Sequence, residues 1–176
     1  VCVYLPPVGS NFYLSIGNTD GILMLENCLF DILSEHDCYV IISGDLNARI
    51  SDLSEAILVD DGYFNPLHRN VSYNMDSHSQ DNTLNGFGKA LLNLCTTFNL
   101  CIMNGRCRGD HEGRFTYISD FGSSVIDYFV VSFELYSRIC DSCKLVVDDS
   151  ILTDHMPVSF LISPVQNYIS DCTGGS

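Results

Sequence analysis

The sequence predicts an α/β sandwich, in which packed β-sheets lie inside and helices cover them. Short apolar runs alternate along the chain with amphipathic stretches, and hairpin-like connections join several of the runs. At 176 residues, of which 46% are hydrophobic, the chain is large enough for one domain with its own core. We expect residues 1–163 to form this domain and residues 164–176 to form a polar tail.

The first part of the chain supplies three predicted elements. Residues 1–5 read as a strand. Apolar residues at helical spacing between Ile22 and Leu33 then predict a helix, with Asp20 as its N-cap. The continuous apolar run over residues 39–43 predicts a strand that is covered on both of its faces.

A long polar stretch, residues 51–82, separates these elements from the rest, and we expect it to form a surface segment over the site. Apolar residues from Phe87 to Phe98 recur at helical spacing and predict a second helix. The remaining expected elements are strands over residues 100–103, 114–118, 125–131, 144–147 and 157–162, and a short helix capped by Ser132. No run of about 18 apolar residues occurs, so no membrane-spanning helix is expected.

The net charge of −14 argues against a surface that binds nucleic acid through charge alone, because such surfaces gain affinity from Lys and Arg. Three of the eight basic residues, Arg106, Arg108 and Arg114, lie close together in the sequence. Two interpretations stay open for them: a loop that contacts phosphate, or an ordinary solvated loop.

The chain has nine cysteines, an odd number, and most of them lie in apolar periodic stretches. Because cysteine packs well as a small core residue, we expect reduced thiols and no disulfide bonds. Cys140-Asp141-Ser142-Cys143 is a single CxxC motif, which without a second pair is a weak signal for a metal site.

Polar motifs interrupt or end several apolar strands. Gly44-Asp45-Leu46-Asn47 follows the run 39–43, Asp127 lies inside the run 125–131, and Thr153-Asp154-His155 stands near the end of the domain. Buried carboxylates are avoided unless they are paired, hydrogen-bonded or bound to a metal. Their repeated presence at strands therefore points to phosphate or metal chemistry.

Asp45 and Asn47 are two residues apart, so on an extended backbone their side chains would point the same way. The alternative is a tight turn, for which Gly-Asp-x-Asn is also suitable. Asp154 and His155 are neighbours, so on an extended backbone they would face opposite sides.

In this order, the motifs resemble the endonuclease/exonuclease/phosphatase superfamily, and within it the endonuclease domain of non-LTR retrotransposons. The resemblance extends from Val3 to about Leu161. The residues that carry it are Val3-Tyr4-Leu5-Pro6-Pro7, Gly44-Asp45-Leu46-Asn47, Leu84 to Cys95, Arg114-Phe115-Thr116-Tyr117, Gly122 to Tyr128 and Thr153-Asp154-His155. Each motif alone is weak, and it is their order that makes the resemblance specific.

The resemblance implies a four-layer α/β/β/α sandwich and a metal-dependent phosphodiesterase that nicks DNA before reverse transcription. It implies Mg²⁺ or Mn²⁺ as cofactor, DNA as substrate and fusion to a reverse transcriptase in the full-length protein. The place of action would be intracellular, and nuclear if the enzyme works on chromosomal DNA. A divalent ion stabilises charge on the phosphate and helps the leaving group, while a positioned base activates the water.

The resemblance also assigns catalytic roles. Asp45 would activate the water, and Asn47 would donate its amide to a phosphate oxygen. His155 would contact the scissile phosphate, with its imidazole oriented by the carboxylate of Asp127. Tyr4 would contact phosphate, although a lone tyrosine on a strand is more typical of packing in a sheet.

Two further positions would bind substrate and one would bind metal. Thr116 matches a position near the substrate phosphate, for which the alternative is a simple β-former, and Arg114 belongs to the basic loop described above. Asp154 would be the metal ligand.

The resemblance also implies that two site residues of the family, an asparagine and a metal-binding glutamate, precede the strand that carries Tyr4. The chain then corresponds to the C-terminal two-thirds of the domain, and we expect it to be unstable and inactive alone. Two alternatives remain: a catalytically inactive truncated remnant, or a phosphodiesterase of the same fold that acts on a substrate other than nucleic acid.

Overall fold

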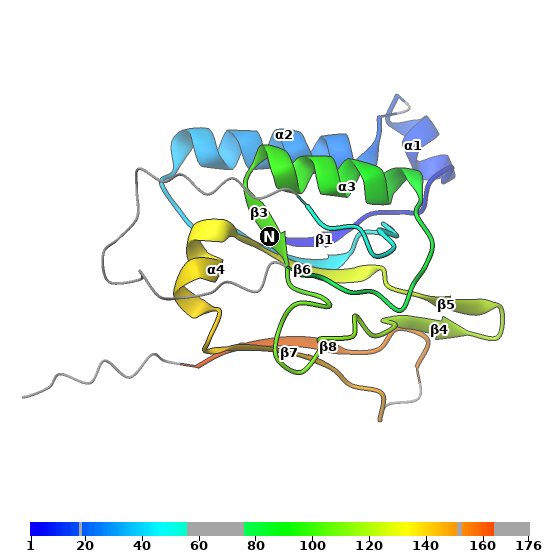
Figure 1. Ribbon diagram of the computed structural model, residues 1–176. Coiled ribbons are helices and arrows are strands. Elements are labelled where there is room, and N and C mark those ends of the chain that lie inside the picture. Colours follow the sequence, from blue (N-terminus) through cyan, green and yellow to red (C-terminus); the bar gives the residue numbers. More distant parts are fainter. Residues whose placement is uncertain (18, 56–75, 151–152, 164–176) are drawn as a thin grey trace, which may run out of the picture.

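A mixed four-stranded sheet forms the centre of the protein, in the order β1-β2-β6-β3 (Figure 1). The computed structural model describes residues 1–17, 19–55, 76–150 and 153–163. Strand β1 (Cys2–Tyr4) runs parallel to β2 (Ile41–Asp45), and β2 runs antiparallel to β6 (Asp127–Ser132). On its other side β6 pairs antiparallel with β3 (Leu100–Ile102).

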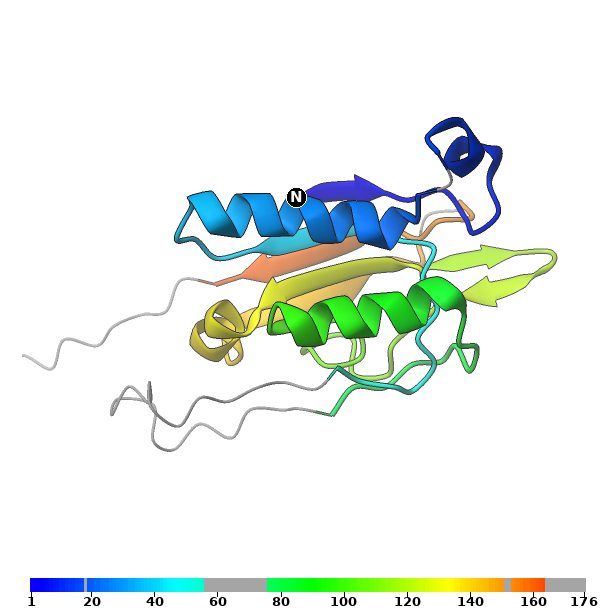
Figure 2. The ribbon, with the colours of Figure 1, turned by 90° about the horizontal axis from the view of Figure 1, so that it is seen from above.

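Two helices cover one face of this sheet. Helix α2 (Gly21–Glu35) and helix α3 (Gly86–Thr97) lie side by side over the strands, and the short α1 (Asn11–Ser15) precedes α2 (Figures 1 and 2). The N-cap predicted for α2 is confirmed, because the Asp20 side chain accepts hydrogen bonds from the backbone N–H groups of Ile22 and Leu23. Buried apolar side chains from both helices and from the sheet form one core cluster.

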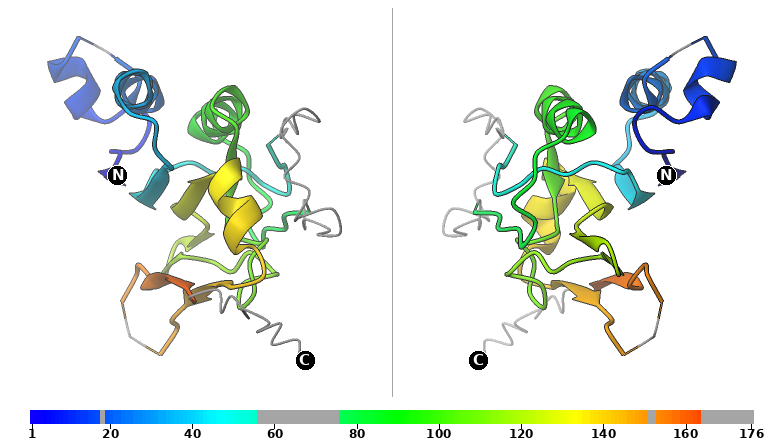
Figure 3. Two further views of the ribbon diagram at one scale, coloured as in Figure 1. Left: turned by 90° about the vertical axis from the view of Figure 1, so that its left-hand side faces the viewer. Right: turned by 90° about the vertical axis from the view of Figure 1, so that its right-hand side faces the viewer.

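A second, smaller sheet lies on the opposite side of the central sheet. Strand β7 (Cys143–Val147) pairs antiparallel with β8 (Val158–Ile162), and helix α4 (Phe133–Ile139) leads from β6 into β7 (Figure 3). Side chains of α4, β6 and β7 form a second core cluster between the two sheets. The layers are therefore helices, central sheet and small sheet, which confirms the predicted α/β class.

A hairpin projects from one end of these layers. It consists of β4 (Tyr117–Ser119) and β5 (Gly122–Ser124), and it lies at the end of the sheet where β2 finishes and β6 begins (Figure 1). The predicted strand over residues 114–118 begins later than expected, at Tyr117, and β5 and α1 were not predicted. Helix α1 has five residues and β5 has three, so both are too short to show an apolar repeat.

Two other predictions need correction. The strand expected over residues 39–43 spans Ile41–Asp45, which places Asp45 inside the strand pairing. Ser132 stands at the N-cap of α4, but its hydroxyl accepts from the N–H of Val40 at 3.3 Å and makes no hydrogen bond to the helix. The polar side chain thus ties α4 to the start of β2 instead of capping the helix.

Much of the polar stretch over residues 51–82 lies outside the described residues, and so does the expected tail. The described residues at both ends of the polar stretch are mostly exposed or half-buried, as expected for a surface segment, but Glu55 and Asp81 are buried. The eight described cysteines are free, and Cys172 lies outside the described residues. Within the described part of the chain, no helix combines the length and apolar character needed to span a membrane.

Candidate active site

Three predicted site residues form a row across neighbouring strands. In the register of the sheet, Tyr4 of β1 is paired with Asp45 of β2, and Asp45 is paired with Asp127 of β6. Side chains of paired residues in adjacent strands lie on the same face of a sheet. Tyr4 is exposed and the two aspartates are half-buried, so the row opens to solvent at this end of the sheet.

Gly44 makes this row possible. Its φ is +135°, and a Cβ added there would lie 1.9 Å from the carbonyl oxygen of Val3 in β1. Only glycine allows this close approach of the two backbones without strain. The glycine before Asp45 therefore has a structural reason in the pairing of β1 with β2.

His155 completes the cluster from a distant part of the chain. Its Nδ1 lies 3.1 and 3.2 Å from the two carboxylate oxygens of Asp127. Ligand atoms of Asp45, Asp127 and His155 all lie within 4.8 Å of one another. The structure thus brings together three residues that the sequence placed at separate strands.

The β4 backbone holds His155 in place. Tyr117 forms an antiparallel bridge with His155, and their rings make an edge contact with centroids 4.9 Å apart. The flanking N–H of Met156 donates to the carbonyl of Thr116 at 2.7 Å, and the N–H of Ile118 donates to the carbonyl of Asp154 at 2.8 Å. The imidazole is 43% exposed, so it remains accessible while its backbone is fixed.

Asp45 and Asn47 form a turn, so the prediction of an extended backbone between them is wrong. Asn47 has a φ of +47°, and its N–H donates to Oδ1 of Asp45 at 2.9 Å. Its side-chain Nδ2 donates to the carbonyl of Leu5 at 2.8 Å and to Oδ2 of Asp45 at 3.3 Å. The amide donor predicted to contact phosphate instead holds the Asp45 carboxylate against the end of β1.

The pKa of Asp45 is raised above its ordinary value. Partial burial is the largest cause, and the nearby charge of Asp127 acts in the same direction. The hydrogen bond from the Asn47 N–H and the proximity of His155 lower the pKa and offset part of this rise. A carboxylate with a raised pKa is better suited to accept a proton from water.

Thr116 is fully buried, so the prediction that it contacts substrate is wrong in this structure. Its hydroxyl oxygen accepts hydrogen bonds from the N–H groups of Ile126 and Asp127, both at 3.0 Å. The residue therefore fixes the turn that leads into β6 and positions the backbone of Asp127.

Asn104 fixes the same strand from the other side and was not predicted. Its Nδ2 donates to the carbonyl of Asp127, and its Oδ1 accepts from the N–H of Phe129, both at 3.0 Å. A polar residue directly after the apolar run 100–103 was the one sequence signal for it. Together, Thr116 and Asn104 satisfy backbone groups on both sides of the site aspartate.

Asn85 links the Asn47 turn to helix α3 and was also missed. Its Oδ1 accepts from the N–H of Gly88 at 2.7 Å, as an N-cap, and from the N–H of Arg49 at 3.0 Å. Its Nδ2 donates to the carbonyl of Asn47 at 2.9 Å. Arg49 in turn makes a bidentate ion pair with the buried Asp81, with both N–O distances at 2.7 Å.

The predicted basic loop does not form a cluster of free cations. The Arg106 side chain is fully buried and paired with Glu55, and Arg114 pairs with Asp149 and donates to the carbonyl of Val147 at 3.0 Å. Arg106 therefore fits neither of the two interpretations of the loop, because a fully buried side chain can neither contact phosphate nor face solvent. Arg114 lies at β7, and its contacts are not with the acidic cluster.

Asp154 is exposed, and it does not belong to the group of ligand atoms formed by Asp45, Asp127 and His155. Its carboxylate lies 3.4 Å from the hydroxyl of Thr153. The prediction that Asp154 binds metal stays a prediction.

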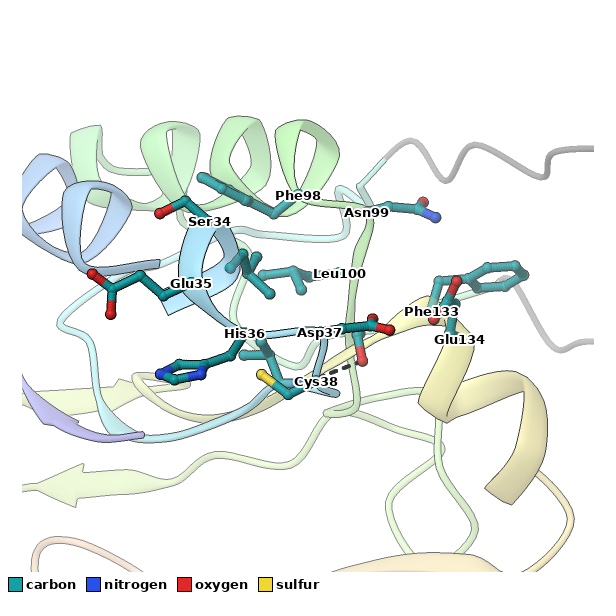
Figure 4. Close-up of a pocket in the computed structure, with 13 residues that line it drawn as sticks. Ser34, Glu35, His36, Asp37, Cys38, Phe98, Asn99, Leu100, Phe133 and Glu134 are labelled. Carbon is teal, nitrogen blue, oxygen red and sulfur yellow. Dashed lines mark hydrogen bonds between the residues drawn. The ribbon is translucent and has the colours of Figure 1, made fainter. Parts of the chain in front are cut away.

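A pocket of about 500 Å³ lies at the opposite end of the sheet, beside the residue that precedes β2 (Figure 4). Its lining includes the carboxylates of Glu35, Asp37 and Glu134, and no Lys or Arg is among the described residues that line it. Such a pocket is unsuited to a phosphate group. The Asp45–Asp127–His155 cluster is therefore the better candidate for phosphate chemistry.

No protein-family model matches this chain, and no curated protein matches it.

Proposed function

We propose that this chain carries the catalytic cluster of a metal-dependent phosphodiesterase, and specifically of a retroelement-type DNA endonuclease. The observation that supports this best is the convergence of Asp45, Asp127 and His155, with the Asp127 carboxylate on Nδ1 of the imidazole. The motif order described for the sequence supports the choice of a retroelement enzyme. Fusion to a reverse transcriptase and a nuclear place of action are part of the same proposal.

We also propose the four-layer α/β/β/α sandwich as the complete fold. The helices α2 and α3, the central sheet and the β7–β8 sheet correspond to three of its layers (Figure 3). No helix covers the outer face of β7 and β8 within the described residues.

The proposed roles follow from the hydrogen bonds. The carboxylate of Asp127 holds the His155 ring in one tautomer, which leaves the far nitrogen to act on a phosphate oxygen. Asp45, with its raised pKa, takes the proton of the attacking water. Asn47 positions Asp45 instead of contacting substrate itself, and the exposed Tyr4 is left to donate to phosphate.

The donor set fits a divalent ion. Carboxylate oxygens are the ligands that Mg²⁺ and Mn²⁺ prefer, and carboxylate oxygens of Asp45 and Asp127 lie within 4.8 Å of each other, close enough to share one ion. A cation there would relieve the repulsion between the two aspartates, and the exposed Asp154 beside His155 is a further proposed ligand. When bound, the ion would supply charge stabilisation at the phosphate and help for the leaving group.

The test is a nicking assay. The protein, expressed with any coding sequence that precedes Val1, is incubated with supercoiled plasmid and Mg²⁺. We expect relaxed plasmid, and a loss of at least about a hundredfold in rate for His155→Ala. His111→Ala changes an exposed histidine outside the cluster and serves as the matched control. Equal nicking by wild type and His155→Ala would overturn the proposal, and a folded wild type without activity would favour the inactive remnant.

One observation favours a second candidate, a phosphodiesterase that acts on a substrate less charged than DNA. The net charge is −14, and Arg49, Arg106 and Arg114 are all committed to ion pairs with acids. These arginines are therefore poorly placed to attract duplex DNA. Hydrolysis of a small synthetic phosphodiester, dependent on His155, without any nicking of plasmid would support this candidate.

A further inference from the structure

Two buried cysteines face each other between the central sheet and the small sheet. The sulfur atoms of Cys107 and Cys143 lie 3.2 Å apart, and both residues are buried. Their backbones run side by side, because the N–H of Leu145 donates to the carbonyl of Arg108 at 2.9 Å. The pair therefore joins a loop and a strand whose relative position is already fixed.

We propose that Cys107 and Cys143 are a reversible redox modification site, at which a peroxide oxidises the two thiols to an intrachain disulfide. The inference is independent of the phosphodiesterase proposal, because neither sulfur belongs to the acidic cluster. The sulfur atoms already touch, so bond formation needs only a small closing movement and no rearrangement of β7.

The surroundings identify Cys143 as the attacking thiol. The hydrogen bond from the Cys107 thiol is the largest cause that lowers the pKa of Cys143, and the positive charge of Arg108 adds a smaller effect in the same direction. Burial and the negative charge of Asp141 oppose them, but the pKa of Cys143 remains lowered. The pKa of Cys107 is raised, first by its contact with Cys143 and then by burial. Of the two thiols, Cys143 therefore loses its proton first.

The reaction balances with hydrogen peroxide as the oxidant. The Cys143 thiolate attacks one peroxide oxygen, the O–O bond breaks, and the other oxygen leaves as hydroxide, which takes up a proton to become water. The sulfur of Cys107 then attacks the sulfenic acid on Cys143, the S–O bond breaks, and the Cys107 proton leaves with the oxygen as a second water. The two thiols together lose two electrons and two protons.

The bond would connect the small sheet to the loop that supports the strand of Asp127. Cys107 follows Asn104 closely in the same loop, and Asn104 holds the backbone of Asp127 and Phe129. Cys143 begins β7 of the small sheet. Oxidation would therefore attach the loop that supports the site strand to the neighbouring sheet.

The direct test is a peptide map of the oxidised wild type. The full chain is treated with hydrogen peroxide, digested without reduction and analysed by mass spectrometry. We expect one linked peptide pair containing Cys107 and Cys143, two hydrogens lighter than the reduced peptides, which a dithiol converts back. The oxidised protein should melt roughly 5–10 °C higher than the reduced protein, because the cross-link restricts the unfolded chain.

Variants separate this pair from the neighbouring thiols. Cys101→Ser changes a buried cysteine of the same core cluster, and Cys140→Ser changes the other cysteine of the CxxC motif. Both variants should still form the bond, while Cys107→Ser should not. The proposal would be overturned if the wild-type map showed Cys140 linked to Cys143, or if the peptides remained separate after peroxide treatment. Because this result comes from the wild type, it holds even if a variant does not fold.

Discussion

The carboxylate of Asp45 is held between opposing influences. Burial and the charge of Asp127 raise its pKa, and the turn with Asn47 and the nearby His155 lower it, with a net rise. The turn with Asn47 fixes the orientation of this carboxylate, and the raised pKa makes it bind a proton more tightly than usual. Both properties suit the base proposed at this position. The raised pKa also makes the folding stability depend on pH.

The first prediction is that Asp45→Asn removes part of this pH dependence. Because the folded pKa lies above the ordinary value of 3.8, the folded state binds the proton more tightly than the unfolded state. The stability from this group is fully present below that value and is lost as pH rises through the folded pKa. In metal-free buffer near pH 7 the variant should be more stable than wild type by at most about 1 kcal/mol, since solvent screens a half-exposed group.

Urea unfolding of both proteins between about pH 4 and pH 7 measures this difference. The asparagine keeps an oxygen that accepts from the Asn47 N–H, so the turn is preserved. A difference that stays constant with pH, or one that shrinks as pH rises, would contradict the assigned direction.

The second prediction concerns Thr116, whose hydroxyl is buried behind the site. In Thr116→Val the N–H groups of Ile126 and Asp127 lose their acceptor, which should lower the free energy of unfolding by about 1–3 kcal/mol. Thr116→Ser keeps the oxygen and should lose less. Chemical denaturation of the two variants provides the comparison, and a Val variant as stable as the Ser variant would show that these bonds contribute little.

At the scale of elements, the helices could be predicted because their signals are local. Asp20 and the apolar spacing of α2 depend on neighbours within a few residues, and both appear as expected. The row formed by Tyr4, Asp45 and Asp127 depends on strand register, which a single sequence does not display. The motif order predicted which residues matter, but not how they are paired.

The wrong assignments have a common physical cause. Thr116 and Asn47 were given contacts with substrate, and each instead satisfies backbone groups or a carboxylate of the site itself. The contacts of Asn104 with β6 and of Asn85 with Asn47 were missed because the partners are distant in sequence, and no periodicity marks such contacts. Only the cap that Asn85 provides for Gly88 has a local signal. Polar residues around a half-buried carboxylate are needed first to satisfy it and its backbone.

The third prediction compares two helix caps. Asp20→Ala removes a cap from α2 and should lower the free energy of unfolding by about 1 kcal/mol. Asn85→Ala removes the cap of α3 and also the bonds to Arg49 and Asn47, so its loss should be larger, about 2–3 kcal/mol. If Asn85→Ala costs no more than Asp20→Ala in the same thermal or urea measurement, the link from α3 to the site turn is energetically unimportant.

At the scale of the whole molecule, an ion pair inside the core connects distant parts of the chain. The side chains of Glu55 and Arg106 are fully buried, and Glu55 also accepts from the N–H of Ile102 in β3 at 2.9 Å. Breaking a buried pair on one side leaves an uncompensated charge, whereas neutralising both partners does not. The pair is therefore a sensitive point of the fold.

The fourth prediction follows from this asymmetry. Arg106→Met should lower the free energy of unfolding by about 3–5 kcal/mol, because the Glu55 carboxylate stays buried without its cation. The double variant Glu55→Gln/Arg106→Met should recover a large part of the loss, since the amide oxygen still accepts from Ile102 and carries no charge. Equilibrium unfolding of the single and double variants tests this, and a double variant less stable than Arg106→Met would refute it.

The last prediction is that divalent ions stabilise the folded protein through the acidic cluster. An ion that binds only the folded state raises the free energy of unfolding as the ion concentration increases. The gain is about 2.7 kcal/mol when the ion concentration is a hundred times its dissociation constant. For a chain of this size that corresponds to a rise in melting temperature of roughly 5–10 °C, which EDTA should reverse.

Neutralising both acids in Asp45→Asn/Asp127→Asn should abolish the shift, because these carboxylates offer the ligand atoms. Asp31→Asn, an exposed acid on α2, should leave it unchanged. Thermal melts in Mn²⁺ and Mg²⁺ give the answer, and an equal shift in the double variant would mean that the ion binds elsewhere on this acidic surface.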